Sequence, residues 1–145
     1  PFRPVVYGAG WEGQLPEGVE LRGPADYNHD LPRIYRSDAV HLSFTNLQMR
    51  ACPNQRVFDV GACGNAVLND RLEGWTDLFG RDLDELLYDD VQTLVERTES
   101  LLASPERRRS LAETLRTVVL EKHTIRNRVE TLLSLLQSRG NPEQA

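Results

Sequence analysis

One stretch of the sequence, residues 54–70, most limits the folds open to this chain. It reads NQRVFDVGACGNAVLND, which predicts a short helix, a glycine that ends the helix, and an apolar strand. Gly64 suits the helix end because glycine readily adopts the left-handed conformation often found there. The apolar run of residues 66–68 is typical of a buried strand, and Asn69 and Asp70 follow where that strand would reach the edge of its sheet.

The predicted helix places Arg56 and Asp59 close together, one turn apart. In open α/β sheets, ligands bind outside the carboxyl ends of the strands. A guanidinium and a carboxylate on the helix just before such a strand are therefore candidate ligand contacts. The alternative is an ion pair within the helix that has no role in binding.

Strands and helices alternate through the first two thirds of the chain, which predicts an α/β fold with a parallel sheet covered on both faces. The other expected strands are residues 4–7, 19–23, 39–44 and 85–88, and the expected short helices are residues 31–36 and 72–79. Helical periodicity then runs over residues 91–102, from Pro105 after a capping Ser104, and again after residue 124 until Gly140 and Pro142. We expect a Rossmann-like sheet of about five strands with flanking helices and a helical C-terminal extension wrapped around it.

Composition narrows the class of protein. The chain has 145 residues, which suits one domain, and its net charge of −5 argues against a nucleic-acid partner. It contains no apolar run long enough to span a membrane and no visible signal peptide. Because the first residue is Pro1, we infer a piece of a longer chain, with a domain over residues 1–138 and a polar tail over residues 139–145.

The two cysteines, Cys52 and Cys63, form no C-x-x-C pair, and the three histidines are scattered. Free thiols of this kind indicate a reducing compartment, so we expect a cytoplasmic protein.

Gly8 and Gly10 follow the first predicted strand, where glycine lets the backbone turn sharply or approach a ligand. No third glycine opens a helix, so the dinucleotide-binding fingerprint is absent. Two interpretations stay open here: a loop that lines a ligand, and a tight turn with Trp11 packed on the domain.

Two further patterns are weaker. Asp82 and Asp84 form a D-x-D pair, which binds a divalent metal in some enzymes, but a polar turn usually leaves such carboxylates solvated, so we expect no metal site. His41 alternates with apolar neighbours in a predicted strand, which indicates a structural histidine rather than a catalytic one.

Three blocks of the sequence together resemble a known family. They are LPRIYRSDAVHL at residues 31–42, NQRVFDVGACG at residues 54–64, and EKHTIRNR at residues 121–128. The chain resembles the C-terminal, donor-binding domain of GT-B glycosyltransferases of the group 1-like kind, and it is most similar to the spore-maturation CgeB-like group. The resemblance covers nearly the whole chain, and the R-V-F-D-x-x-A-C-G block followed by H-T-x-x-x-R is fairly specific.

The resemblance implies half of a GT-B fold that holds a nucleotide-diphosphate sugar, with no cofactor and no essential metal. The full-length protein would be a hexosyltransferase acting on an unknown acceptor, which could be a cell-surface glycan, a protein or a lipid. The N-terminal domain of the same chain would supply the general base and the acceptor site, so we expect no turnover by this piece alone. Catalytic residues stay unassigned, as does the choice between retention and inversion.

The resemblance also implies roles for particular residues. Asp59 falls where such enzymes place an acid on the nucleotide ribose, because a carboxylate accepts hydrogen bonds from both vicinal hydroxyls. Arg56 would face the diphosphate, together with backbone amides around Asn54 and Gln55 at the helix start.

The remaining expected contacts come from loops. Arg22 and Gly23 would lie near the base by position. The set of expected nucleotide-sugar contacts is completed by Gly8, Gly10, Thr45 and Asn46.

The chain also departs from the wider family. Such enzymes often carry two glutamates that flank seven residues, and the first, which touches the sugar, corresponds to Ala51 here. A catalytically inactive nucleotide- or glycan-binding module, or a structural module, is therefore the alternative. A flavodoxin-like receiver would need an acidic cluster after the first strand, where this chain has Gly-Ala-Gly after Tyr7. We expect His123 and Arg128 to anchor the last helix rather than to act in catalysis.

Overall fold

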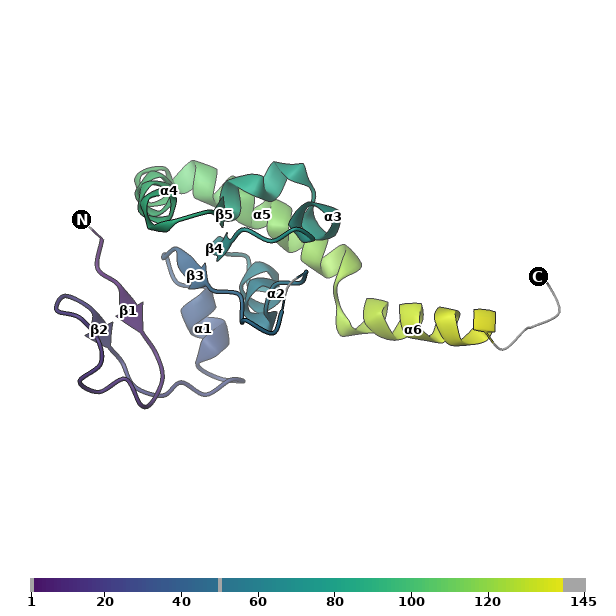
Figure 1. Ribbon diagram of the computed structural model, residues 1–145, viewed down its shortest axis with the longest axis horizontal. Helices are drawn as coiled ribbons and strands as arrows, with labels where there is room; N and C mark the ends of the chain where they lie inside the picture. The colour runs from purple at the N-terminus through teal and green to yellow at the C-terminus, as the bar shows by residue number, and fades with distance from the viewer. Residues whose placement is uncertain (1, 50, 140–145) are drawn as a thin grey trace.

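The computed structural model describes residues 2–49 and 51–139 and shows an α/β fold (Figure 1). Its strands are β1 (Val5–Val6), β2 (Glu20–Leu21), β3 (His41–Ser43), β4 (Val67–Asp70) and β5 (Leu87–Tyr88). Its helices are α1 (Leu31–Tyr35), α2 (Gln55–Ala62), α3 (Trp75–Phe79), the 3-10 helix η1 (Arg81–Leu86), α4 (Val91–Ala103), α5 (Pro105–Lys122) and α6 (Ile125–Arg139). The expected end of the last helix at Gly140 and Pro142, and the tail beyond it, lie outside the described residues.

The strands form two parallel sheets, one with the order β1-β2 and one with the order β3-β4-β5. The expectation of a single sheet of about five strands is therefore wrong, although the parallel arrangement is confirmed. Differences in burial between the strands explain why they form two sheets. Strands β1 and β2 have two residues each, none of them fully buried, and Val5 is 39% exposed. Helix α1, which leads from them to β3, buries no residue, so little apolar surface would be gained by joining the two sheets.

Helix α2 begins and ends through local hydrogen bonds. The Asn54 side chain caps its start by accepting a hydrogen bond from the Arg56 amide at 2.9 Å. At its end, Gly64 has φ of +78°, and the Asn65 amide donates to the Val60 carbonyl at 3.2 Å, which is the bonding of a Schellman motif. The predicted helix stop at Gly64 is confirmed.

The hydrophobic core lies between the three-stranded sheet and the helices α2, α3, α4 and α5. Its buried side chains all come from residues 57–119; the largest fully buried ones include Trp75, Leu68, Leu83, Leu86, Leu101 and Leu115. Strand β4 is at the centre, with β3 and β5 on either side and every one of its first three residues buried. Residues 2–34 contribute nothing to this core.

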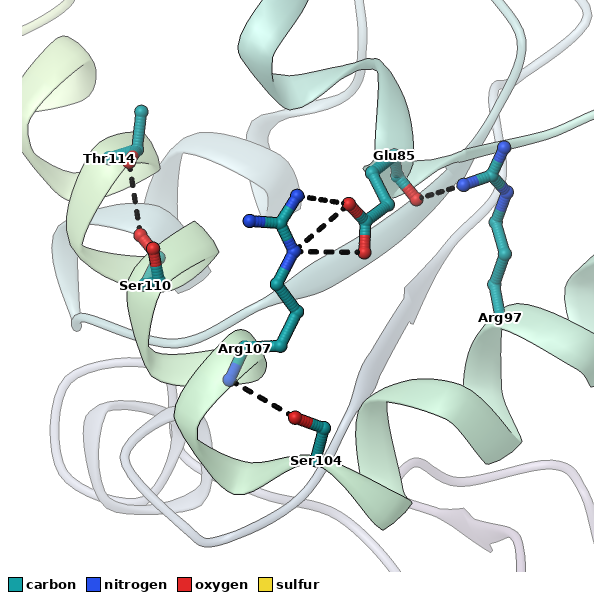
Figure 2. Close-up of polar contacts among 6 residues, drawn as sticks. All are labelled: Glu85, Arg97, Ser104, Arg107, Ser110 and Thr114. Atoms are coloured by element: carbon teal, nitrogen blue, oxygen red, sulfur yellow. Dashed lines mark hydrogen bonds and ion pairs between the residues drawn. The ribbon is translucent and has the colours of Figure 1, made fainter.

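Two arginines connect η1 to the helices that follow it (Figure 2). The Arg107 Nε donates to Glu85 Oε2 at 3.1 Å, and the Arg97 Nη1 donates to the Glu85 carbonyl oxygen at 2.7 Å. The hydrogen bonds from Arg107 lower the pKa of the Glu85 carboxyl. Ser104 caps α5 next to this contact by accepting from the Arg107 amide, as the Ser-Pro sequence predicts.

Helix α6 extends away from the body of the molecule (Figure 1). Its apolar side chains are about half exposed or more: Ile125, Val129, Leu132, Leu133, Leu135 and Leu136. The expectation that the whole helical C-terminus wraps around the sheet is therefore wrong for α6. Helical periodicity predicts an apolar face but not what covers that face.

The joint between α5 and α6 agrees with the anchoring role expected for His123 and Arg128. The His123 Nε2 lies 2.8 Å from the Leu78 carbonyl oxygen, and its Nδ1 lies 3.3 Å from the Arg128 Nη2. The imidazole also packs edge-on against Phe58 and Phe79, each at 5.5 Å between ring centroids. Because Nδ1 accepts from a guanidinium, Nε2 carries the proton and donates to Leu78.

The contact between α2 and α5 depends on Gly61. A Cβ added there would lie 2.9 Å from Leu115 Cγ and 3.2 Å from Val119 Cγ2, and both side chains are buried. We expect Gly61→Ala to lower the free energy of unfolding by about 1 kcal/mol, because overpacking costs about 1–3 kcal/mol and helix propensity returns only about 1 kcal/mol. Urea denaturation would measure this. The control Glu113→Ala, on the exposed side of α5, should change stability by less than about 0.5 kcal/mol, and a stabilised Gly61→Ala chain would contradict the close packing.

Candidate functional site

The start of α2 lies at the carboxyl edge of the three-stranded sheet. Strands β3 and β4 are parallel, so the helix between them begins beside the end of β3. The Asn54 side chain fixes this position, since its Nδ2 donates to the Phe44 carbonyl oxygen at 2.8 Å, one residue after β3. The structure therefore brings Asn54, Gln55 and Arg56 to the edge at which parallel α/β sheets bind ligands.

Thr45 is held at the same edge by Asp70, and the sequence pattern did not predict this contact. The Asp70 Oδ1 accepts from the Thr45 amide at 2.7 Å and from its hydroxyl at 2.8 Å. Both donors of Thr45 therefore serve to fix the loop after β3. Asn46 is exposed in the next turn, where its carbonyl accepts from the Met49 amide. The only local signal for Asp70 was a polar residue at the end of an apolar strand.

Arg56 and Asp59 lie outside the buried face of α2, which Val57 and Val60 form. Arg56 is exposed and Asp59 is half-buried. Among the ion pairs of residues 2–49 and 51–139, none joins Arg56 to Asp59. The alternative of an ion pair within the helix is thus not what the structure shows.

Asp59 instead contacts Tyr27, from the loop before α1. The Tyr27 hydroxyl donates to Asp59 Oδ2 at 3.0 Å and accepts from the Gln55 Nε2. The hydrogen bond to Asp59 raises the pKa of the Tyr27 phenol. Nothing in the local sequence pattern indicated this contact, because the two residues are 32 positions apart.

The other expected residues gather at the carboxyl ends of β1 and β2. The Gly8 amide donates to the Gly23 carbonyl oxygen at 2.7 Å, with φ of +143° at Gly8 and +66° at Gly23. Arg22 donates to Glu20 at 2.6 Å and to the Tyr7 hydroxyl at 3.1 Å.

The loop after β1 is a compact turn. The Gly10 carbonyl accepts from the Gln14 side chain at 2.8 Å, and the indole of Trp11 lies over Gly8, where an added Cβ would be 3.2 Å from Nε1. The structure agrees with the tight-turn interpretation, although Trp11 itself remains 46% exposed.

A cavity of about 240 Å³ lies beside this second group. It is lined by Tyr7, Arg22, Pro24, Ala25, Asp30, Arg33 and Ile34. A smaller cavity of about 200 Å³ lies elsewhere, between η1 and α4. Neither cavity includes Arg56 or Asp59, so the expected residues form two groups, with the loop of residues 24–30 between the larger cavity and Asp59.

The described part of the chain holds no cluster of three or more His, Cys, Asp or Glu side chains that could bind a metal ion. Asp82 is exposed, and Asp84 accepts from the Thr76 hydroxyl at 3.3 Å. Within the same residues, none of the helices has the length and apolar character needed to cross a membrane.

The sequence model of a family described as "Glycosyl transferase-like" matches residues 2–134. The chain belongs to this family. The match spans both groups of expected site residues, and membership supports a role in glycosyl transfer with a sugar donor as partner. No curated protein and no solved structure matches this glycosyl transferase-like chain.

His41 lies behind the site and has a structural role in this family member. Its Nε2 is 3.2 Å from the Asn65 Nδ2, and its ring packs edge-on against Tyr35 at 5.5 Å. Burial lowers the pKa of His41 to about 4, and the nearby charge of Arg56 adds to the effect. The imidazole is therefore neutral at physiological pH.

This burial predicts a dependence of stability on pH. The pKa of His41 is about 4 in the folded chain, below the ordinary value of 6.5. The contribution of neutral His41 to the free energy of unfolding is therefore complete above pH 6.5 and is lost as pH falls toward 4. The loss amounts to at most about 3 kcal/mol. Urea denaturation at several pH values should show a smaller loss in His41→Gln, whose amide stays neutral. Equal losses in the two chains would contradict the prediction.

Proposed function

We propose that this chain is the donor-binding portion of a glycosyltransferase and that it holds a nucleotide-diphosphate sugar at the carboxyl edge of β3 and β4. The observation that carries the proposal is that Arg56 and Asp59 lie outside the core on a helix that begins at this edge, in a member of a glycosyl transferase-like family. Neither side chain belongs to the buried core, to which α2 contributes Val57 and Val60.

The chemistry of the two side chains fits two parts of such a donor. A carboxylate accepts hydrogen bonds from adjacent hydroxyls, so Asp59 would bind the ribose. A guanidinium pairs with phosphate oxygens, so Arg56 would bind the diphosphate. The positive end of α2, which begins at Gln55, would add to the attraction. No metal ion is needed in this scheme, because Arg56 and the helix end supply the positive charge.

The cavity beside Arg22 would receive the base. It adjoins the Gly8–Gly23 contact, and its walls combine apolar groups with the guanidinium groups of Arg22 and Arg33. Loop 24–30 separates this cavity from Asp59, so a nucleotide would lie along the loop with its base in the cavity and its ribose at the carboxylate.

The rest of the reaction belongs to parts that this chain does not supply. We propose a cytoplasmic hexosyltransferase whose N-terminal domain binds the acceptor, either a glycan, a protein or a lipid, and provides the general base. Ala51 stands where a sugar-binding glutamate is common in the wider family, and its methyl group offers no hydrogen bond. We therefore expect no transfer of sugar by the isolated chain, and robust product formation from any nucleotide sugar would contradict this.

A non-catalytic nucleotide- or glycan-binding module is the second candidate. Ala51 favours it, because the chain then lacks one of the contacts through which donor sugars are recognised. Failure of every nucleotide to bind would favour a purely structural module.

Direct titration tests the proposed site. Uridine, guanosine and adenosine diphosphates would each be titrated against the chain by calorimetry, and at least one should bind. We expect Asp59→Ala to weaken that binding at least about tenfold, because hydrogen bonds to a charged group contribute about 1.5–3 kcal/mol. Asp82→Ala, which removes an exposed carboxylate from η1, serves as the control and should bind like the unchanged chain. Equal affinity of Asp59→Ala and the unchanged chain would overturn the assignment of Asp59.

A further inference from the structure

The loop of residues 24–30 has a fixed shape and presents Tyr27 to α2. The Asp26 Oδ1 accepts from the amides of Asn28 and His29 at 2.9 and 2.8 Å, and the Asp30 Oδ2 accepts from the Asp26 amide at 2.9 Å. These bonds hold the turn from within. Tyr27 thus lies in a segment that is held near Gln55 and Asp59 by its own hydrogen bonds rather than by the core.

Hydrogen bonds rather than burial keep Tyr27 in place. Its side chain is 53% exposed, and its hydroxyl bridges Gln55 and Asp59, one turn apart on α2. An exposed contact of this kind is weak and changes an equilibrium constant by about five- to tenfold. A ligand group that offers Asp59 an equivalent donor can therefore replace it.

The contact with Tyr27 competes with the binding of a vicinal diol by the carboxylate. Two adjacent hydroxyls engage both carboxylate oxygens, and the phenol already takes one of the two acceptor positions of Asp59 Oδ2. We propose that Tyr27 is a specificity-determining gate residue, an internal competitor that a ribose or another vicinal diol must displace from Asp59. The inference rests on the proposed function and deepens it.

One displacement would free two groups of the site. When the phenol leaves, Asp59 Oδ2 and the Gln55 amide both lose their partner, and both become available to the ligand. The same loop also borders the larger cavity through Pro24, Ala25 and Asp30. A base that enters the cavity therefore contacts the segment that carries the competing phenol.

The first test needs no ligand. The Tyr27 ring would be followed through an alkaline titration by NMR, with Tyr27→Phe used to assign its signals. Because Asp59 raises the pKa of the phenol, Tyr27 should titrate at a higher pH in the unchanged chain than in Asp59→Asn. Titration at the same pH in both chains would show that the contact is absent in solution and would overturn the proposal.

The second test measures competition. Tyr27→Phe keeps the ring and removes the hydroxyl, so it should bind a nucleoside diphosphate about five- to tenfold more tightly than the unchanged chain. The gain should vanish with the matching 2′,3′-dideoxynucleoside diphosphate, which has no hydroxyl to offer Asp59, and in the double variant with Asp59→Ala. Asp82→Ala, a substitution on η1 outside these contacts, is the control and should show no gain.

The outcomes separate this inference from the proposed function. Unchanged or weaker binding by Tyr27→Phe, with binding that still depends on Asp59, overturns the gate and leaves the nucleotide site standing. Absence of binding by both the unchanged chain and Tyr27→Phe overturns both. A tighter Tyr27→Phe complex, selective for the diol, supports both.

Discussion

The close approach of α2 to α5 at Gly61 is the contact on which the rest of the structure depends. With no side chain at this position, Leu115 and Val119 pack directly against the helix backbone. Val57 and Val60 are then fully buried, which fixes the rotation of α2 about its axis. That rotation leaves Arg56 exposed and Asp59 half-buried beside Tyr27, so a packing constraint in the core determines which side chains the edge of the sheet can offer to a ligand.

Local signals in the sequence were sufficient for the end of α2 and the start of α5. Gly64 predicted the end of α2 because the left-handed backbone there has a strong residue preference, and Ser104 followed by proline predicted the start of α5 for a similar reason. The division of the strands into two sheets could not be predicted in this way. Val5 and Val67 both belong to short apolar runs, and only the tertiary structure decides that the first is exposed and the second buried.

The same limit applies to the site. The burial of Val57 and Val60 could be predicted from their spacing on one short helix, and it leaves Arg56 and Asp59 outside the core. The partners of the site residues could not be, because Tyr27 reaches Asp59 and Asp70 reaches Thr45 across long separations in the chain. Hydrogen bonds of this kind are set by how the elements pack, and no short sequence pattern records them.

The position of the core has a mechanical consequence. All of its buried side chains come from residues 57–119, whereas the cavity beside Arg22 is built from residues 2–34, which add none. A small molecule seated against both Arg22 and Asp59 would join two parts of the chain that hydrophobic packing leaves separate. It would link the two sheets, and the β1-β2 sheet would be stabilised by the bound molecule rather than by a hydrophobic core of its own.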